Sequence, residues 1–299
     1  MIRIAVLFCF SLVGCSQAQP SLQEHLQNLA GIWVEARYCK VFSKTSSALA
    51  SMTVFDPNYP VALRIQPKEQ DDSYFRIGYG VLHDHMLHPE ISGCKILATG
   101  DSICEQSYFM VNSQRPDSLN FYRLSPNEDF FNYECDAFFS WEYGTDTVLL
   151  LYRPASAELP ELTVRYVRVA RSFKDDYPYP NPLYYFTRVR LLAGTFTVKD
   201  AAGKVVCTKL IIGEDGKMAG FLPFKNRLCY FSTDVYCGPQ ETEDVVLCCL
   251  VDDASEFDCD AYYYHALPFG VFQFLERKYN EESEEYEVGK VKYTFIKHG

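Results

Sequence analysis

The chain has 299 residues, 48% of them hydrophobic, which is enough for one large or two medium-sized domains with packed cores. A formal net charge of −11 and the lack of a Lys/Arg cluster exclude a nucleic-acid-binding surface and disfavour adsorption onto anionic lipids. The 22 Tyr and 22 Phe, with apolar runs such as TVLLLY (147–152), favour strands over helices.

The N-terminus reads as an export signal. A positive start, MIR, precedes the apolar run IAVLFCFSLVG (4–14), which predicts a signal peptide over residues 1–14. This run is shorter than the roughly 20 apolar residues that a membrane-spanning helix needs. Any membrane association is therefore expected to come from a covalent anchor.

The residues that follow supply such an anchor. LVGC (12–15) resembles the bacterial lipobox, and the resemblance implies cleavage before Cys15 and its diacylation with fatty acids such as palmitate. The protein would then be lipid-anchored in the cell envelope, at the outer membrane, on its periplasmic or surface side. The alternative is cleavage after Ala18, which would give a secreted protein.

After the anchor we expect a tether and short helix over residues 15–29, because Leu22, Leu26 and Leu29 recur at helical spacing. From residue 30 onward, short apolar or alternating stretches between polar turns predict strands. In the first half the expected strands are 31–38, 61–66, 73–81, 92–98, 106–112, 118–124, 147–153 and 161–169.

The proline-rich segment SFKDDYPYPNP (172–182) interrupts this pattern and predicts a linker. Gly203 and Gly216, in AAGK and EDGK, are expected to form tight hairpin turns. Each half is expected to have about eight strands. A closed β-barrel of eight strands has an interior that holds its own side chains or one small ligand. The second set is 194–199, 204–212, 217–224, 227–233, 244–251, 258–264, 269–276 and 286–297.

Two similar pentapeptides open these sets, LAGIW (29–33) and LAGTF (192–196). A short helix, then Gly-x-Trp on the first strand, then a meander whose last strand carries a cation, resembles the lipocalin (calycin) family. The whole chain is similar to the two-domain lipocalin-like lipoproteins of Bacteroidetes. The resemblance implies an all-β fold of two tandem antiparallel β-barrels of about eight strands each, preceded by a short helix, with barrels at 30–171 and 183–299.

The resemblance also implies how each barrel is closed at one end. Gly31 and Trp33 match the family's first strand, and Arg165 or Arg168 matches the cation that packs on the Trp. The second barrel would use Gly194 and Phe196, with Lys292 or Lys297 as the cation. A cation over an aromatic ring contributes roughly 0.5 to 2 kcal/mol, and more over Trp than over Phe.

Cysteine usage suits an exported protein. Removing Cys9 and Cys15 leaves an even number in each half, which favours disulfides within each half; the alternative is buried thiols in strands. Cys248 and Cys249 should point to opposite faces of a strand and so are not expected to bond to each other. The remaining cysteines are Cys39, Cys94, Cys104 and Cys135, then Cys207, Cys229, Cys237, Cys248, Cys249 and Cys259.

Catalytic and cofactor motifs are scarce. His83, His85 and His88 in HDHMLH form a weak metal-site candidate, whose alternative is a polar hairpin end. Acidic runs such as NEESEEYE (280–287) are expected in solvated turns, and no G-x-S-x-G elbow or glycine-rich phosphate loop occurs. We therefore expect neither an enzyme nor a cofactor, and no nucleic-acid partner.

The expected function is the binding of a small apolar or amphipathic ligand in at least one barrel. The alternative is a structural or interaction module whose barrels are filled by side chains and whose surface binds another envelope protein or a host molecule. The size of the inward-facing side chains separates these two readings, because large rings leave no room for a ligand.

Overall fold

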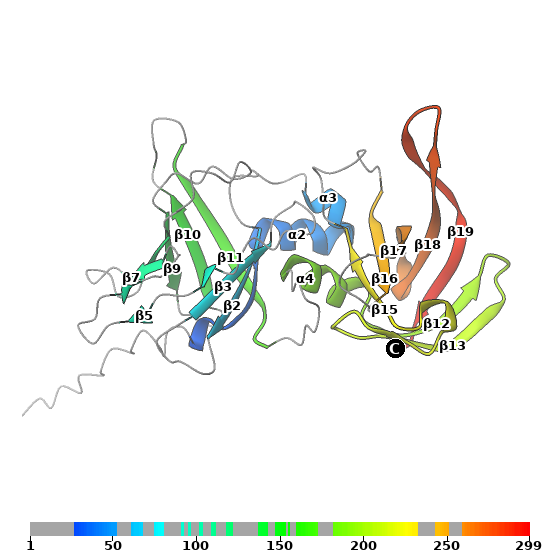
Figure 1. Ribbon diagram of the computed structural model, residues 1–299, viewed down its shortest axis with the longest axis horizontal. Helices are drawn as coiled ribbons and strands as arrows, with labels where there is room; N and C mark the ends of the chain where they lie inside the picture. The colour runs from blue at the N-terminus through cyan, green and yellow to red at the C-terminus, as the bar shows by residue number, and fades with distance from the viewer. Residues whose placement is uncertain are drawn as a thin grey trace, which may run out of the picture.

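The computed structural model describes residues 27–52, 61–67, 75–80, 91–92, 95–96, 102–103, 109–111, 118–121, 137–142, 147–153, 155, 160–172, 182–232, 243–250 and 259–299. Most of these residues form antiparallel strands, as the sequence predicts. The strands build two large sheets, at the two ends of the molecule in Figure 1.

The first sheet belongs to the first half of the chain. Its strands follow the order β4-β3-β2-β1-β11-β10-β9-β8-β7, and β5 and β6 form a separate pair. The strands are β1 (Gly31–Glu35), β2 (Ala62–Pro67), β3 (Phe75–Gly80), β4 (Ile91–Ser92), β5 (Lys95–Ile96), β6 (Ser102–Ile103), β7 (Phe109–Val111), β8 (Ser118–Phe121), β9 (Ala137–Glu142), β10 (Val148–Arg153) and β11 (Leu162–Ala170).

The second sheet has the order β14-β13-β12-β19-β18-β17-β16-β15. Its elements are β12 (Gly194–Asp200), β13 (Val205–Ile212), β14 (Met218–Ala219), the 3-10 turn η1 (Leu222–Phe224), β15 (Arg227–Phe231), β16 (Val245–Leu250), β17 (Cys259–Leu267), η2 (Pro268–Gly270), β18 (Val271–Asn280) and β19 (Glu285–Lys297). Gly203 and Gly216 adopt the positive φ expected of their turns, 78° and 85°.

The two sheets share one topology. In each, the first strand pairs with the second and also with the last: β1 with β2 and β11, and β12 with β13 and β19. Among the described residues both strand orders are nevertheless linear, and no continuous ladder joins the end strands of either sheet, so the prediction of closed barrels is not confirmed. In the second half the end strands β14 and β15 approach each other at an isolated Lys217–Leu228 bridge, beside a 3.0 Å hydrogen bond from Cys229 N to the Gly216 carbonyl.

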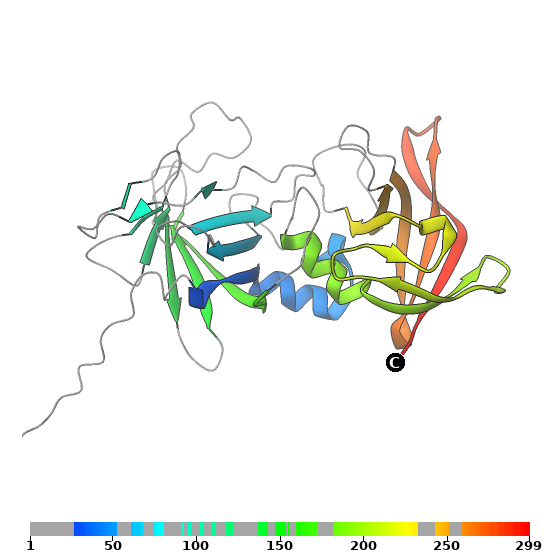
Figure 2. The ribbon, with the colours of Figure 1, turned by 60° about the horizontal axis from the view of Figure 1, so that its bottom comes forward.

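A layer of helices separates the sheets, as Figures 1 and 2 both show. It contains α2 (Ala36–Thr45), α3 (Ala48–Met52) and α4 (Pro182–Leu191). The rings of Tyr38 and Phe42 on α2 lie 6.0 and 5.1 Å from that of Phe186 on α4. The largest apolar cluster among the described residues runs from the first sheet through these helices to the inner face of the second.

Helix α2 corrects the predicted strand 31–38, which ends at Glu35. The Glu35 carboxylate caps the helix by accepting a 2.7 Å hydrogen bond from Tyr38 N, and its other oxygen pairs with Arg37 Nε at 2.6 Å. Tyr38 and Phe42, four residues apart, then face the core together. The all-β prediction is therefore wrong for residues 36–52.

Helix α4 was not predicted either. Its residues 182–188 are all buried, because α4 contacts β1, β2 and β3 of one sheet and β15 of the other. A helix that is buried all round has no polar stripe, and PLYYFTRVRL is rich in aromatic and β-branched residues that favour strands. Pro182, the last residue of the predicted linker, begins this helix; residues 173–181 lie outside the described part.

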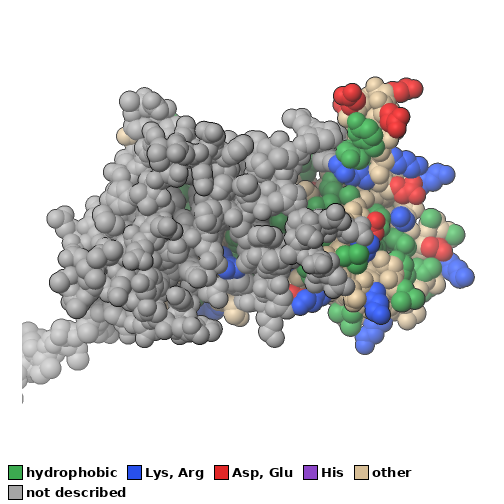
Figure 3. Space-filling view, in the orientation of Figure 1, with side chains coloured by type: hydrophobic (Ala, Val, Ile, Leu, Met, Phe, Trp, Pro, Cys, Tyr) green, Lys and Arg blue, Asp and Glu red, His purple; other side chains and the backbone are tan. Residues whose placement is uncertain are grey.

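The long β18–β19 hairpin projects from the second sheet. Its turn, residues 281–284, carries exposed acidic side chains, which gather at its tip in Figure 3. The acidic run NEESEEYE is therefore solvated, as predicted. Of the predicted N-terminal helix, the structure describes only residues 27–29, which are helical. Within the described ranges, no helix has the length and apolar character needed to cross a membrane.

Candidate functional site

The inner face of the second sheet is packed with aromatic rings. At its centre, the ring of Phe295 lies 4.5 Å from that of Phe272 and 4.6 Å from that of Phe274, measured between centroids. Phe224, on η1, caps this stack at 6.3 Å from Phe295. These rings occupy the space that a ligand inside the sheet would need. The full cluster is Phe196, Phe221, Phe224, Phe231, Tyr262, Tyr264, Phe272, Phe274, Tyr293 and Phe295.

A Trp and a cation link the neighbouring strands β1 and β11, at the centre of the first sheet. Trp33 is fully buried, and its Nε1 donates a 2.7 Å hydrogen bond to the Leu29 carbonyl. The guanidinium of Arg168 lies 5.0 Å from the Trp33 ring centroid and donates to the carbonyl of Asn28. Arg165, the other candidate, is exposed on β11. Arg168 therefore joins the last strand to both the ring and the preceding helical turn.

The second half has a similar arrangement with weaker partners. Phe196 is fully buried, and Lys297 Nζ lies 5.9 Å from its ring centroid. Lys292, the other candidate, lies over a different ring, 5.4 Å from the centroid of Tyr262. A Lys over Phe is a weaker pair than an Arg over Trp.

The glycines of the two pentapeptides also occupy equivalent positions. Gly31 begins β1 with φ 133°, and Gly194 begins β12 with φ 150°. A Cβ would lie 2.1 Å from the Ala170 carbonyl oxygen at Gly31, and 2.7 Å from Lys297 Cε at Gly194. Only glycine combines this φ with such a close approach. The two halves thus repeat one local structure around their first and last strands.

An open groove of about 520 Å³ lies where the turn between α2 and α3 meets the end of β17. The described residues that line it include two carboxylates and one imidazole but neither Lys nor Arg, so we call it the acidic groove. The lining residues are Thr45, Ser46, Ser47, Leu49, Ala50, Glu243, Asp244, Tyr264, His265, Ala266 and Leu267.

Asp244 forms the base of this groove. Its Oδ1 accepts a 2.7 Å hydrogen bond from Leu49 N, and Ser47 and the Ala48 N–H also donate to its carboxylate. Burial, with a smaller contribution from the nearby Glu243, raises the pKa of Asp244 although the three hydrogen bonds lower it. Asp244 therefore caps α3 from the other half of the chain and ties the helical layer to β16.

The rim of the groove is more exposed. Glu243 Oε2 lies 3.3 Å from His265 Nε2, and the two side chains are 41% and 37% exposed. This contact becomes an ion pair when His265 is protonated. Glu243 thus offers an accessible carboxylate next to the buried one.

Exposed apolar side chains lie at the end of β17 and in the turn η2 that follows it. Phe269, in the turn η2, is 98% exposed, and Leu267 is 41% exposed. Phe269 also has a left-handed backbone, with φ 63°, which non-glycine residues rarely adopt. An aromatic side chain held in solvent on a constrained turn is a candidate contact for another molecule.

A second groove, of about 420 Å³, lies over β17, β18 and β19. Its two carboxylates pair with cations: Asp260 with Arg227 at 3.4 Å, and Glu276 with Lys278 at 3.3 Å. Its other cations, Arg277 and Lys292, lie over the rings of Tyr286 and Tyr262.

Several predicted site residues lie outside the described part, namely Cys15, His83, His85 and His88. Among the residues that the structure does describe, no group of three or more His, Cys, Asp or Glu side chains is placed to hold a metal ion.

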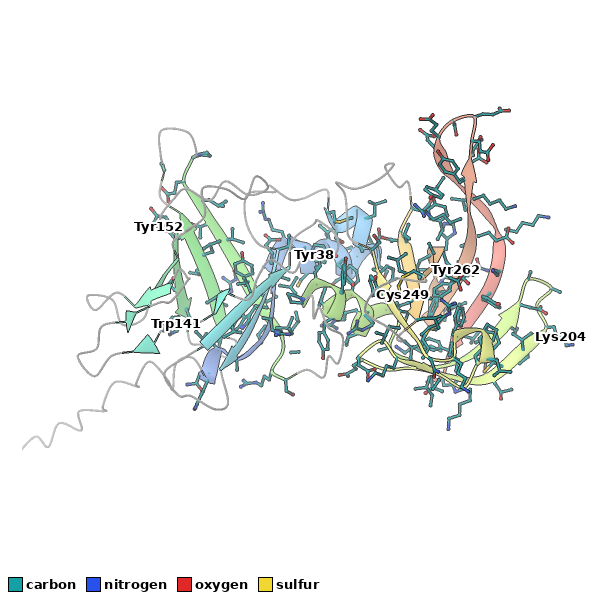
Figure 4. All side chains as sticks on the ribbon, viewed as in Figure 1. Tyr38, Trp141, Tyr152, Lys204, Cys249 and Tyr262 are labelled. Atoms are coloured by element: carbon teal, nitrogen blue, oxygen red, sulfur yellow. A yellow bond between two sulfur atoms is a disulfide. The ribbon has the colours of Figure 1, made fainter. Side chains whose placement is uncertain are left out.

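One disulfide is present among the described cysteines. Cys249 on β16 is bonded to Cys259 on β17, and Figure 4 labels Cys249 beside the helical layer. Cys94, Cys104, Cys135 and Cys237 lie outside the described residues. The other described cysteines, which are present as thiols, are Cys39, Cys207, Cys229 and Cys248.

Sequence reasoning did not find the acidic groove, because three segments far apart in the chain build it. A signal for its helical wall was present: Tyr38 and Phe42 are spaced by one helical turn, and the Ser46–Ser47 pair precedes α3. Nothing in the sequence pairs Asp244 with that helix.

No protein-family model matches the sequence, and no curated protein matches it.

Proposed function

We propose that this chain is a non-enzymatic interaction protein of the cell envelope, anchored through fatty acids on Cys15, that binds another protein at the acidic groove and Phe269. The observation that carries the proposal is the aromatic packing inside the second sheet. Because those rings fill the interior, the second half is better suited to present a surface than to carry a small ligand.

We also infer that both halves are variants of one lipocalin-like barrel. The shared strand topology supports this, with the first strand next to the last in each half. The repeated pairs Trp33–Arg168 and Phe196–Lys297 support it further. In this architecture the barrel is a rigid scaffold, and the turns at its ends carry the binding surface.

The groove indicates the chemistry of the partner. Glu243 offers a carboxylate at the rim, and Leu267 and Phe269 offer apolar surface beside it. A protein segment with a Lys or Arg next to an apolar side chain would satisfy both. Phe269 would be the principal anchor, because a large exposed ring buries more apolar area on binding than its neighbours.

The test places a photoreactive amino acid at position 269 of the full-length, anchored protein in its native cells. We expect one specific adduct that is lost when Glu243→Gln and Leu267→Ser are added. The matched control is position 205, since Val205 is also an exposed apolar residue (45%) but lies on the β12–β13 hairpin. An adduct formed equally at position 205, or unaffected by the two substitutions, would contradict the proposal.

Solvent extraction of the purified protein tests the alternative function. We expect no bound apolar compound in stoichiometric amount. Recovery of such a compound would favour the ligand carrier over the interaction module. An adduct at 269 of twice the protein's own mass would show that a second copy, rather than another protein, occupies the surface.

A further inference from the structure

The vicinal cysteines of VVLCCLV point to opposite faces of β16, and each faces a cysteine on a different neighbouring strand. Cys249 is opposite Cys259 on β17, to which it is bonded. Cys248 is opposite Cys229 on β15. Both members of this second pair are thiols, fully buried in the apolar core.

The register favours a bond between Cys229 and Cys248. The Cα atoms of Cys249 and Cys259 are 4.0 Å apart, which marks a non-hydrogen-bonded pair, since hydrogen-bonded pairs are about 5.5 Å apart. The backbone groups of Cys249 therefore point toward β15. One residue along, Cys248 points its backbone groups toward β17, so Cys229 and Cys248 also form a non-hydrogen-bonded pair.

Such pairs have Cα atoms about 4.5 Å apart, which is inside the range of about 4.4 to 6.8 Å found for disulfides. The Cys229 and Cys248 side chains also lie on the same face, because both belong to the cluster that fills the sheet.

We propose that Cys229 and Cys248 form a second disulfide in the mature, exported protein. Each thiol loses its proton, the two sulfur atoms become bonded, and the two electrons reduce a disulfide oxidant, either a protein or a small molecule, to two thiols. One thiolate first attacks the oxidant to form a mixed disulfide, and the other then displaces the oxidant's thiol. The inference rests on the proposed export but not on the proposed partner.

The bond forms during folding rather than afterwards. In the folded chain both thiols have no exposed surface, and burial raises the pKa of Cys229 to about 12. The attacking thiolate is therefore scarce and out of reach of an oxidant once β15 and β16 have packed.

A disulfide between Cys229 and Cys248 would stabilise the edge of the second sheet. β15 is an end strand of its sheet, and its contact with β14 is the isolated Lys217–Leu228 bridge. With both disulfides, β16 would be linked covalently to β15 on one side and to β17 on the other. An end strand would then be secured where the sheet is not continuously paired.

Mass spectrometry of the full chain, exported from cells, tests the proposal. The protein is denatured and alkylated without reduction, then cleaved on the N-terminal side of aspartates, which places Cys229, Cys237, Cys248–Cys249 and Cys259 in four separate fragments. We expect the fragments with Cys229, Cys248–Cys249 and Cys259 to be recovered as one linked species. Recovery of Cys229 and Cys248 as alkylated thiols, or of Cys229 linked to another cysteine, would overturn the proposal.

Two variants assign the bonds within that species. In Cys248→Ala, the Cys229 fragment should be released while Cys259 stays linked to Cys249. A Cys229 fragment still linked through Cys249 would be a contrary result. Cys207→Ala is the matched control: Cys207 is a partly buried thiol on β13 whose Sγ contacts the Gly220 carbonyl, and its loss should leave the linked species unchanged.

Discussion

Truncation of Phe295 to Ala tests whether side chains fill the space on the inner face of the second sheet. Phe295 has no exposed surface, and its ring lies within 6.4 Å of those of Phe196, Phe224, Phe272 and Phe274. In a packed core, Phe→Ala costs about 3 to 5 kcal/mol, as the sum of lost transfer free energy and the cavity left behind. We expect the upper part of this range, because β12, η1 and β18 hold the surrounding rings in place.

The measurement is the free energy of unfolding from urea titration, followed by circular dichroism. Phe269→Ala is the matched control: the same substitution at a 98% exposed ring should change stability by less than about 0.5 kcal/mol. The cavity in Phe295→Ala should also bind a small aromatic such as benzene, which would recover part of the loss. If Phe295→Ala cost less than about 1 kcal/mol, the interior would be loosely packed and the argument for a filled scaffold would fail.

Three further predictions concern the ends of the strands. Burial raises the pKa of Asp244 above its ordinary value of 3.8, so the stability that this residue contributes is present below that pH and is lost as the pH rises through the raised value. Unfolding titrations should therefore show wild type losing stability relative to Asp244→Asn as the pH rises above the ordinary pKa of 3.8, and a pH-independent difference would contradict this. Gly31→Ala, which meets the Ala170 carbonyl, should lower the melting temperature more than Gly203→Ala, whose Cβ meets nothing within 4 Å; equal effects would refute the close approach. Arg168→Met should lose about 0.5 to 2 kcal/mol by denaturant titration and more than Lys297→Met, and the reverse order would show that the Trp33 contact is not the stronger.

Strand positions were largely predictable because alternation along a strand is a local signal. The expected strands 161–169 and 204–212 match β11 and β13 within one residue at each end. For the cation that packs on Trp33 or Phe196, the sequence left two candidates in each half. Residues of one strand that differ by three positions lie on opposite faces, but the register that selects Arg168 over Arg165 depends on pairing with β1.

The helical layer was missed because its stability comes from distant contacts. α4 reads as a strand by composition and becomes a helix where two sheets bury it from both sides. α3 has five residues, too few for a stable isolated helix. Ser47 caps the Ala50 N–H locally, but the N–H groups of Ala48 and Leu49 donate to Asp244, about two hundred positions away. Sequence patterns carry no record of such a partner.

Because α4 packs against both sheets, the chain cannot be divided into two independent halves without exposing apolar surface. The helix follows the proline-rich segment, yet it packs against β1, β2 and β3 as well as β15. A gene fragment cut within that segment, before Pro182, would leave the helix with the second sheet, separate it from the first, and leave an apolar surface in water. The halves resemble each other in topology, but they are not interchangeable modules, and a transplant of either one would need to bring the helix and a substitute for the face it loses.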